Sequence, residues 1–215
     1  MARKVRLKLS ALRNRPAQQA RDDLLAAALQ IMERGGKVTI AAAAKEAGIS
    51  TGTAYRYFAD SSTLMIKAIQ QQQIAIRGDI FADLAREFAH TANIEDRILL
   101  VHQVTFDLVR RHESASRIFL ARSLESRVGS NEGVLDLRNV RRMSMYKMAL
   151  EPLDQTIGPK GVTDLASALS ASSGMESYTV LKDLCGLADD EIDRITRFNL
   201  LAILRAAISP CSEML

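Results

Sequence analysis

The sequence predicts an all-α protein in two parts, and three observations support this. Aromatic residues make up only 5% of the 215 residues, tryptophan is absent and prolines number 4, a composition that favours helices over sheets. Apolar residues recur at helical spacing in one segment after another, and no strand-like alternation persists. Basic residues are concentrated at the N-terminal end. We therefore expect a short basic helical domain followed by a longer helical one.

The charge is distributed unevenly along the chain. Residues 1–60 carry 11 Lys and Arg against 5 Asp and Glu, whereas the remaining residues carry 18 against 20. The formal net charge of +4 thus combines a basic N-terminal part with a slightly acidic remainder. This asymmetry indicates an anionic partner for the first part alone.

Residues 1–16 form the most basic stretch. They include no acidic residue, and their weak periodicity is broken at Pro16. We predict a mostly flexible basic N-terminal arm over residues 1–16. The alternative is a solvated tail with no role, because charge runs are often only that. Its basic residues are Arg3, Lys4, Arg6, Lys8, Arg13 and Arg15.

A first helix is predicted over residues 17–34. Two acidic residues lie in its early turns, where they favour a helix N-terminus, and the pair Gly35-Gly36 ends it. One face of this helix is apolar, and we expect it to hold the next two helices in register. Its core positions are Leu24, Leu25, Ala28, Leu29, Ile31 and Met32.

The stretch from Val38 to Leu64 predicts two short helices joined by a turn. Small apolar residues recur at helical spacing in the first of them, which suits close packing against another helix. Gly48 is placed to end that helix, because glycine adopts the left-handed conformation that closes a last turn. Ser50 is a good N-cap for the second helix, since its hydroxyl can accept a hydrogen bond from a free backbone N–H.

The faces of the second short helix follow from the helical period of about 100 degrees per residue. Ala54 and Phe58 share one side with Ile49 and are expected to pack inward. The outward set then holds a glycine, a threonine, two tyrosines and an arginine, for which no core role is apparent. Hydroxyl and guanidinium groups around a glycine suit a phosphate backbone and base edges. The pattern is that of a recognition helix.

The run ISTGTAYRYF, residues 49–58, resembles the signature of the tetracycline-repressor-like (TetR) family of bacterial transcription regulators. The segment DLLAAALQIMERG, residues 23–35, is similar to the first helix of that family. The resemblance covers residues 24–64 closely and the rest only by length and helical pattern. It implies a three-helix helix-turn-helix DNA-binding domain over residues 17–60 and a helical ligand-binding and dimerisation domain over residues 61–215. The implied function is a repressor that binds a palindromic operator as a dimer and is released by a small-molecule effector.

The residues expected to contact DNA lie on the two motif helices and their turn. Arg56 is a candidate for guanine or phosphate, Tyr55 and Tyr57 for phosphate or a thymine methyl group, and Thr53 for phosphate. The pattern does not assign a particular DNA contact to each residue. The full set is Thr39, Lys45, Ser50, Thr51, Gly52, Thr53, Tyr55, Arg56 and Tyr57.

Several positions depart from the family pattern. Ala43 stands where a larger aliphatic residue is usual, Ala54 is small for a core position, and the link from Gly35 to Thr39 is about one residue short. The most important departure is at Ser61. Family members often carry a lysine where this chain has Ser61, at a position that the resemblance implies to contact phosphate. The basic arm is a candidate to supply this contact, along the phosphate backbone or in the minor groove.

The remaining chain predicts a long helix from Ser61 to Arg77 and five or six further helices. Breaks are expected where glycine, proline or short polar residues cluster, as at residues 158–161. The further helices are expected at residues 79–90, 94–112, 114–127, 132–156, 162–185 and 189–208. The resemblance implies that the helix from Ser61 joins the DNA-binding domain to the ligand-binding domain.

A ligand pocket is expected in the middle of the second domain, because thioethers and aromatic rings with a polar tip suit varied, partly apolar ligands. The alternative for each candidate is an ordinary place in the hydrophobic core. The candidates are His102, Phe106, Phe119, Met143, Tyr146, Met148, Met175 and Tyr178. The three histidines do not cluster, and we expect no metal and no cofactor.

The last two predicted helices suit a dimer interface. The helix over residues 162–185 is rich in small residues, and the final helix is apolar nearly all round late in its length, so it requires cover on both sides. In the TetR family the last two helices form the dimer interface. The alternative is a central core helix within a monomer. The interface candidates are Ala168, Ser172, Ile195, Phe198 and Ile203.

Two other function classes fit the sequence less well. An enzyme is disfavoured, because the chain has no Gly-rich phosphate loop, no G-x-S-x-G elbow and no H-E-x-x-H motif. A helical protein-interaction module is disfavoured by the basic, tyrosine-bearing outer face. Cys185 and Cys211 fit neither a metal site nor a disulfide framework. With no signal peptide and no long apolar run, a cytoplasmic protein without membrane association is expected.

Overall fold

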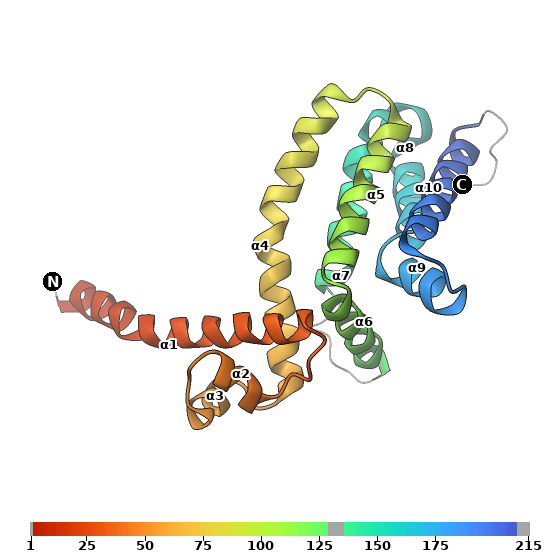
Figure 1. Cartoon of the computed structure of the whole chain (residues 1–215). Helices are drawn as coiled ribbons and strands as arrows, with labels where there is room; N and C mark the ends of the chain where they lie inside the picture. Colours follow the sequence, from red (N-terminus) through yellow and green to blue (C-terminus); the bar gives the residue numbers. More distant parts are fainter. Residues whose placement is uncertain (1, 129–135, 210–215) are drawn as a thin grey trace. The chain divides into compact units, whose positions relative to one another are not determined.

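The structure is a computed structural model that describes the backbone of residues 2–128 and 136–209. It describes the side chains of residues 17–72, 80–121, 123–125 and 141–209. Helices and turns make up both backbone ranges, and no strand occurs in either, so the all-α prediction is confirmed (Figure 1). Within these ranges no helix combines the length and apolar character that crossing a bilayer requires.

The chain divides into two compact units, residues 1–74 and residues 75–215. We call the second unit the body. The helix α4 (Ser61–His90) contributes its first part to one unit and its second part to the other. The predicted boundary at residue 60 therefore differs from the observed division, because Leu64, Ala68 and Ile69 of α4 are buried in the first unit.

The first unit begins with three helices, α1 (Ala2–Glu33), α2 (Ile40–Glu46) and α3 (Thr51–Tyr57), before α4. The helix α1 ends as predicted beside Gly35, whose φ is +69°. It begins at Ala2, however, so the backbone of the stretch predicted as a flexible arm is helical. That stretch is rich in Arg, Lys, Leu and Ala, which are strong helix formers.

The core of the first unit forms where three helices present small or branched apolar side chains. Ala43, Ala44 and Ala54 are fully buried, and their small size lets α2 and α3 pack closely against α1. Of the six core positions predicted on α1, Leu29 is only half-buried. The five that are buried are Leu24, Leu25, Ala28, Ile31 and Met32.

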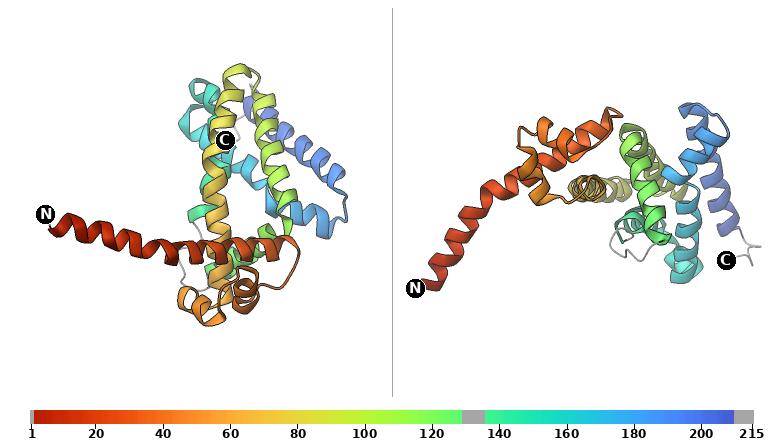
Figure 2. Two further views of the ribbon diagram at one scale, coloured as in Figure 1. Left: turned by 60° about the vertical axis from the view of Figure 1, so that its left-hand side comes forward. Right: turned by 90° about the horizontal axis from the view of Figure 1, so that it is seen from below.

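Figure 2 shows from two further sides how the body is built from helices. After α4 they are α5 (Ile94–Arg111), α6 (Glu113–Val128), α7 (Asp136–Leu150), the short 3-10 helix η2 (Glu151–Leu153), α8 (Asp154–Ala171), α9 (Met175–Thr179), the π-helix η3 (Val180–Leu184) and α10 (Asp189–Ile208). The helices predicted at 94–112, 114–127 and 189–208 agree with α5, α6 and α10 within two residues.

Four predicted boundaries differ from the structure. The helix predicted at 132–156, whose first residues lie outside the described ranges, ends as α7 at Leu150, because Pro152 cannot continue it and η2 follows. The other three differences each lie at a glycine. The helices predicted at 61–77 and 79–90 form the single helix α4, because Gly78 does not interrupt it. The break predicted at residues 158–161 is a kink inside α8, where Gly158 has a φ of +70°. The helix predicted at 162–185 is broken at Gly174, whose φ of +84° is a conformation that other residues rarely adopt.

The main core of the body is lined by residues from α4, α5, α7, α8 and α10. Tyr146 is the largest fully buried side chain in it. The Tyr146 hydroxyl donates a hydrogen bond to Ser173 Oγ at 3.0 Å, and Ser173 in turn donates to the Leu169 carbonyl at 3.0 Å. Burial raises the pKa of the Tyr146 hydroxyl to about 12, so the phenol stays neutral and serves as a donor.

Tyr146→Phe is expected to lower the free energy of unfolding by about 0.5 to 1.5 kcal/mol, because one buried hydrogen bond is lost while the ring is retained. Urea unfolding measures this, and the midpoint should fall with an unchanged m-value. Tyr55→Phe, at a tyrosine that is 55% exposed, is the matched control. Equal stabilities for the two variants would show that the Tyr146–Ser173 bond contributes nothing.

Candidate nucleic-acid interface and body cavity

Hydrogen bonds fix both ends of α2. Thr39 caps α2, since the Ala42 N–H donates to Thr39 Oγ1 at 3.0 Å. At the other end of α2, Gly48 has a φ of +67° and the Ile49 N–H donates to the Ala44 carbonyl at 2.8 Å. This is a Schellman closure, as the sequence pattern predicts.

Ser50 begins the next helix in the predicted way. Its Oγ accepts from the Thr53 N–H at 3.2 Å and donates to Thr53 Oγ1 at 2.9 Å. A helix of seven residues has too few internal hydrogen bonds to be stable alone, so caps and packing determine its orientation. The closure of α2 and the cap of α3 together set the direction in which α3 points.

The two faces of α3 are arranged as predicted. Ala54 and Phe58 are 0% and 2% exposed and pack into the first unit. Tyr55 is 55% exposed, and Arg56 is also exposed. A Cβ atom added at Gly52 would meet nothing within 4 Å, so no contact inside the chain requires glycine there. The exposed face of α3 is therefore available to a partner that approaches the backbone closely.

The other predicted contact residues lie on the same two helices and their turn. Lys45 is exposed in the last turn of α2, and Thr51 is exposed at the start of α3. Thr53 and Tyr57 are half-buried, as is the capping residue Thr39. Three of the predicted hydroxyl groups, those of Thr39, Ser50 and Thr53, thus already form hydrogen bonds within the chain.

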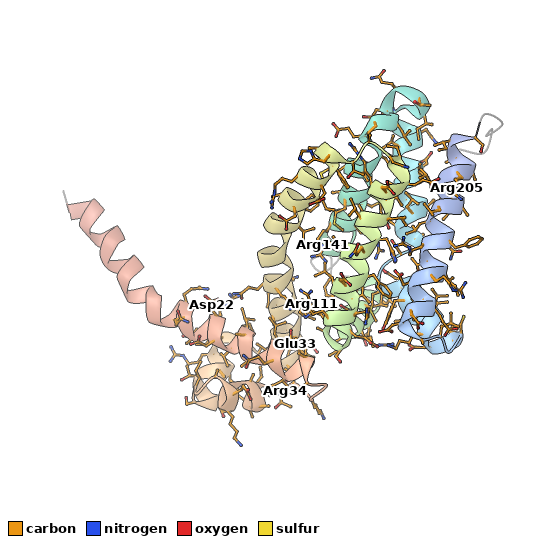
Figure 3. All side chains as sticks on the ribbon, turned by 45° about the horizontal axis from the view of Figure 1, so that its top comes forward. Asp22, Glu33, Arg34, Arg111, Arg141 and Arg205 are labelled. Carbon is orange, nitrogen blue, oxygen red and sulfur yellow. The ribbon has the colours of Figure 1, made fainter. Side chains whose placement is uncertain are left out.

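Two contacts that sequence reasoning did not predict hold α2 and α3 against α1. Arg34, labelled in Figure 3, donates two hydrogen bonds to the Glu46 carboxylate, at 2.9 and 3.1 Å. The hydrogen bond from Arg34 lowers the pKa of the Glu46 carboxyl. The Arg21 guanidinium lies 5.6 Å from the centre of the Phe58 ring. Arg34 directly follows α1 and Phe58 directly follows α3, and the partners in each contact are at least 12 positions apart, so no local pattern indicates these contacts.

In the body, four of the predicted pocket residues come together. His102 and Phe106 of α5 have ring centres 5.4 Å apart, and Phe106 and Tyr178 of α9 have ring centres 6.0 Å apart. Met175 belongs to the same small apolar cluster. Between them lies a cavity of about 10 Å³, which is room for about one water molecule. Its walls are His102, Phe106, Val109, Gly174, Tyr178, Ile192 and Thr196.

The other predicted pocket residues lie elsewhere. Tyr146 is part of the main core, and Met143 and Met148 pack against that core. The Met143 sulfur accepts a hydrogen bond from Ser170 at 3.3 Å. Phe119 is half-buried in α6 and does not line the cavity. Residue type and spacing predict which side chains face inward, but they do not separate one apolar cluster from another.

His102 connects the cavity to α10. Its Nε2 atom lies 2.8 Å from Asp193 Oδ1, and the ring is only 2% exposed. Burial lowers the pKa of the imidazole and outweighs the opposing effect of Asp193. The more distant Arg197 also lowers this pKa, and Asp107 raises it. Because the net direction is downward, a neutral His102 is favoured inside the folded chain.

A polar network that the sequence does not indicate lies beside the cavity. The Lys182 ammonium lies 2.6 Å from the Tyr178 hydroxyl, 3.0 Å from Asp189 Oδ1 and 3.2 Å from Glu113 Oε2. The hydrogen bonds to Tyr178 and Asp189 raise the pKa of Lys182, so it remains charged. Arg117 of α6 donates to both oxygens of Asp183, at 2.6 and 2.8 Å. The network joins α6, η3 and α10.

An open groove of about 620 Å³ runs along α5 and α10, outside the cavity. The Phe106 ring contributes to both, so the cavity and the groove share a wall. The remaining groove residues are polar or charged: Gln103, Asp107, Arg110, Asp189, Asp190, Asp193 and Arg197.

The predicted dimer residues differ in exposure. Phe198 of α10 is 70% exposed, a high value for a large apolar side chain. Ala168, Ser172 and Ile195 are half-buried, and Ile203 packs against the main core. Late in α10 the exposed charge of Arg205, labelled in Figure 3, is paired with Glu95 of α5 by hydrogen bonds of 2.7 and 2.8 Å.

Together these features define the class of fold: an all-α chain in which an N-terminal helix-turn-helix unit precedes a larger helical body. A protein described as a TetR-family transcriptional regulator from Syntrophomonas wolfei has this fold, with a TM-score of 0.59 and 17% identity over 92% of this chain and 99% of that chain. The fatty acid degradation regulator FadR from Bacillus halodurans matches with a TM-score of 0.53 and 14% identity, over 89% and 96% of the two chains. No protein-family model and no curated protein matches. The chain thus has the TetR-like fold that its motif predicts.

The neutral His102 has a consequence for stability. Below its ordinary pKa of about 6.5 the unfolded chain takes up a proton at this residue more readily than the folded chain, so stability should fall as the pH drops from about 7.5 to 5.5. His102→Gln, which can keep a donor toward Asp193, should remove this pH dependence. Its slope in the free energy of unfolding is at most about 1.4 kcal/mol per pH unit. Urea unfolding at both pH values measures it, and His90→Gln controls for loss of an exposed imidazole. If the wild type instead becomes more stable relative to His102→Gln as the pH falls, then Asp193 raises the His102 pKa more than burial lowers it, and a lowered pKa is wrong.

Proposed function

We propose that this chain is a DNA-binding transcriptional regulator that responds to a small molecule, and most simply a repressor that binds a palindromic operator as a dimer. The single observation that carries the proposal is the exposed face of α3. It presents Tyr55 and Arg56 around a glycine with open space above it, on a helix whose opposite side is buried. The TetR-like fold supports the same assignment.

The recognition helix would contact DNA through side chains and backbone together. Arg56 can donate two hydrogen bonds to guanine or bind a phosphate, and the tyrosine hydroxyls of Tyr55 and Tyr57 can donate to phosphate. Gly52 lets a phosphate or a base edge approach the backbone. Ser61, at the start of α4, cannot supply the positive charge that a lysine would, and we assign that role to the basic residues of the 1–16 segment.

A dimer explains the exposed apolar surface of the body. Phe198 and Ile208 of α10 are 70% and 42% exposed, which is unfavourable for large apolar side chains in water. In a symmetric dimer the same patch on a second copy would cover them. Two recognition helices would then meet successive major grooves, about 34 to 36 Å apart, on a roughly palindromic operator.

The cavity beside Phe106 and Tyr178 is the proposed effector site. Its walls are mostly apolar or aromatic, with polar groups at His102, Tyr178 and Thr196, so a partly apolar molecule fits its chemistry. An effector that prefers a body conformation with the two recognition helices wrongly spaced would release the DNA by population shift. We propose no catalytic activity and a cytoplasmic location.

Arg56→Ala is expected to weaken binding to DNA from the chain's own upstream region by about 1 to 3 kcal/mol if Arg56 reads a base. A gel-shift titration at fixed low salt measures the change in affinity. The matched control is Arg86→Ala, which removes an exposed arginine from the body. Unchanged affinity in Arg56→Ala would contradict the assigned face. Failure of the wild type to bind any such fragment would instead favour a protein-interaction module.

Phe198→Glu is expected to convert the dimer to a monomer at micromolar concentration, because two buried carboxylates would face each other across the symmetry axis. Light scattering measures the mass, and the monomer mass is 23.7 kDa. The exposed Lys147→Glu on α7 is the control for an added negative charge. A wild-type mass near that of one chain would refute the dimer.

A further inference from the structure

The segment between α8 and α10 has features of a hinged element. We call residues 174–188, which contain α9 and η3, the strap. Gly174 and Gly186 lie near its ends with φ values of +84° and +69°, and glycine changes its backbone angles at little steric cost. Between them η3 is a π-helix, with bonds such as Cys185 N–H to the Val180 carbonyl at 3.2 Å. Such turns are rare and their hydrogen bonding is less favourable than that of an α-helix.

Apolar burial holds the strap only in part. Met175 and Tyr178 are buried, and Leu181 and Leu187 pack against the small cluster beside the cavity. Two further apolar side chains of the strap point outward, since Val180 and Leu184 are 49% and 81% exposed. Removing the strap from its position would therefore expose less apolar surface than its composition suggests.

Hydrogen bonds to charged groups provide the remaining attachment. Near the first hinge, Arg142 of α7 donates to Glu176 at 3.0 Å, and the Tyr178 hydroxyl lies 2.9 Å from Asp189 Oδ1 and 3.2 Å from Glu113 Oε2. The Lys182 ammonium directs its three hydrogens at Glu113 of α6, at Asp189 of α10 and at the Tyr178 hydroxyl. Asp183 receives two hydrogen bonds from Arg117 of α6. The Lys182 and Arg117 side chains are each 33% exposed, so solvent and salt reach this attachment.

The other two walls of the cavity are held together more firmly. The helices α5 and α10 are joined by the contact at 2.8 Å between Asp193 and the buried His102 ring. Both helices also contribute fully buried residues, such as Val101 and Leu200, to the main core. A ligand larger than one water molecule must displace a wall of a cavity of about 10 Å³, and of its walls the strap is the one whose ends are glycines and whose ion pairs are partly exposed.

We propose that the strap is the movable wall of the cavity, hinged at Gly174 and Gly186 and latched by the ammonium of Lys182 between Glu113 and Asp189. The inference rests on the proposed effector response, because it states how a ligand reaches the cavity. In the closed form the Tyr178 ring covers the cavity. Breaking the Lys182 contacts leaves that ring held by the Tyr178 hydroxyl's bonds to Asp189 and Glu113 alone, which favours an open form with a path toward His102.

A thiol placed in the cavity wall tests the proposal. Thr196 is 4% exposed and lines the cavity from α10, so Thr196→Cys, in a chain with Cys185→Ser and Cys211→Ser, is protected while the strap is closed. The probe is N-ethylmaleimide, and the measurement is its rate of reaction with this thiol. Adding Lys182→Met, which keeps most of the side-chain stem, should raise the rate about tenfold or more at low ionic strength. Lys160→Met, which removes an exposed lysine paired with Asp164 on α8, should leave it unchanged.

The salt dependence of the labelling rate is a second measurement, and the part of it due to Lys182 would be absent if Lys182 only stabilised the fold. Raising the ionic strength from about 0.01 M to about 1 M shortens the Debye length from about 30 Å to about 3 Å and should accelerate labelling more strongly with Lys182 present than in Lys182→Met, where the Arg117–Asp183 pair remains as a salt-sensitive contact with α6. A salt-independent rate in the chain with Lys182 overturns the proposal, even if Lys182→Met fails to fold. Equal labelling of Ala166→Cys, placed in the main core, also overturns it, because global unfolding would then expose both thiols.

These measurements involve no DNA, so the two proposals can fail separately. If the chain binds no operator but the Thr196→Cys thiol responds to Lys182→Met and to salt, the strap proposal holds and the regulator proposal fails. If the chain binds its operator but the thiol shows no response, the regulator proposal holds and the strap proposal fails.

Discussion

The constraint on which the first unit depends is the backbone closure between α2 and α3. At Gly48 the chain takes a left-handed turn, and the carbonyl groups at the end of α2 are satisfied there by the two following N–H groups. Ser50 then starts α3 by accepting from Thr53. These adjacent bonds, together with the burial of Ala54, set the angle of α3. A helix of seven residues with one exposed face requires such a constraint, because it has too few internal hydrogen bonds to be stable alone.

The body is organised by a different kind of interaction. Its main core is apolar, with Tyr146 and Ser173 as a satisfied polar pair inside it. Beside this core, a smaller cluster around Phe106 and Tyr178 is bordered by charged groups from three helices. A dense apolar core resists small movements, whereas partly exposed ion pairs exchange their partners with water at modest cost. The body thus combines a rigid part and a part that can rearrange.

The sequence predicts those features that depend on neighbouring residues. The all-α class, the turn at Gly48, the cap at Ser50 and the burial of Ala54 and Phe58 all follow from spacing within a few positions. Glycine positions are less informative, because glycine permits a break without requiring one: α4 continues through Gly78, whereas Gly174 breaks the helix predicted there.

Features that join distant segments were not predictable in the same way. Nothing near Lys182 in the sequence indicates that Glu113 or Asp189 will surround it, and Arg34 gives no sign of its pairing with Glu46. The predicted pocket residues show the same limit. Their inward orientation follows from periodicity, but only the tertiary fold separates His102, Phe106, Met175 and Tyr178 from the Tyr146 core.

The open space above Gly52 has a consequence for substitution at this position. Glycine inside a helix lowers its stability by about 1 kcal/mol relative to alanine, and here no neighbouring atom compensates for it. Gly52 lies in the first turn of α3, and no described neighbour requires glycine there. Alanine at position 52 should therefore stabilise the folded chain slightly while adding a methyl group to the exposed face of α3, so this one position can separate the stability of the chain from the needs of a bound partner.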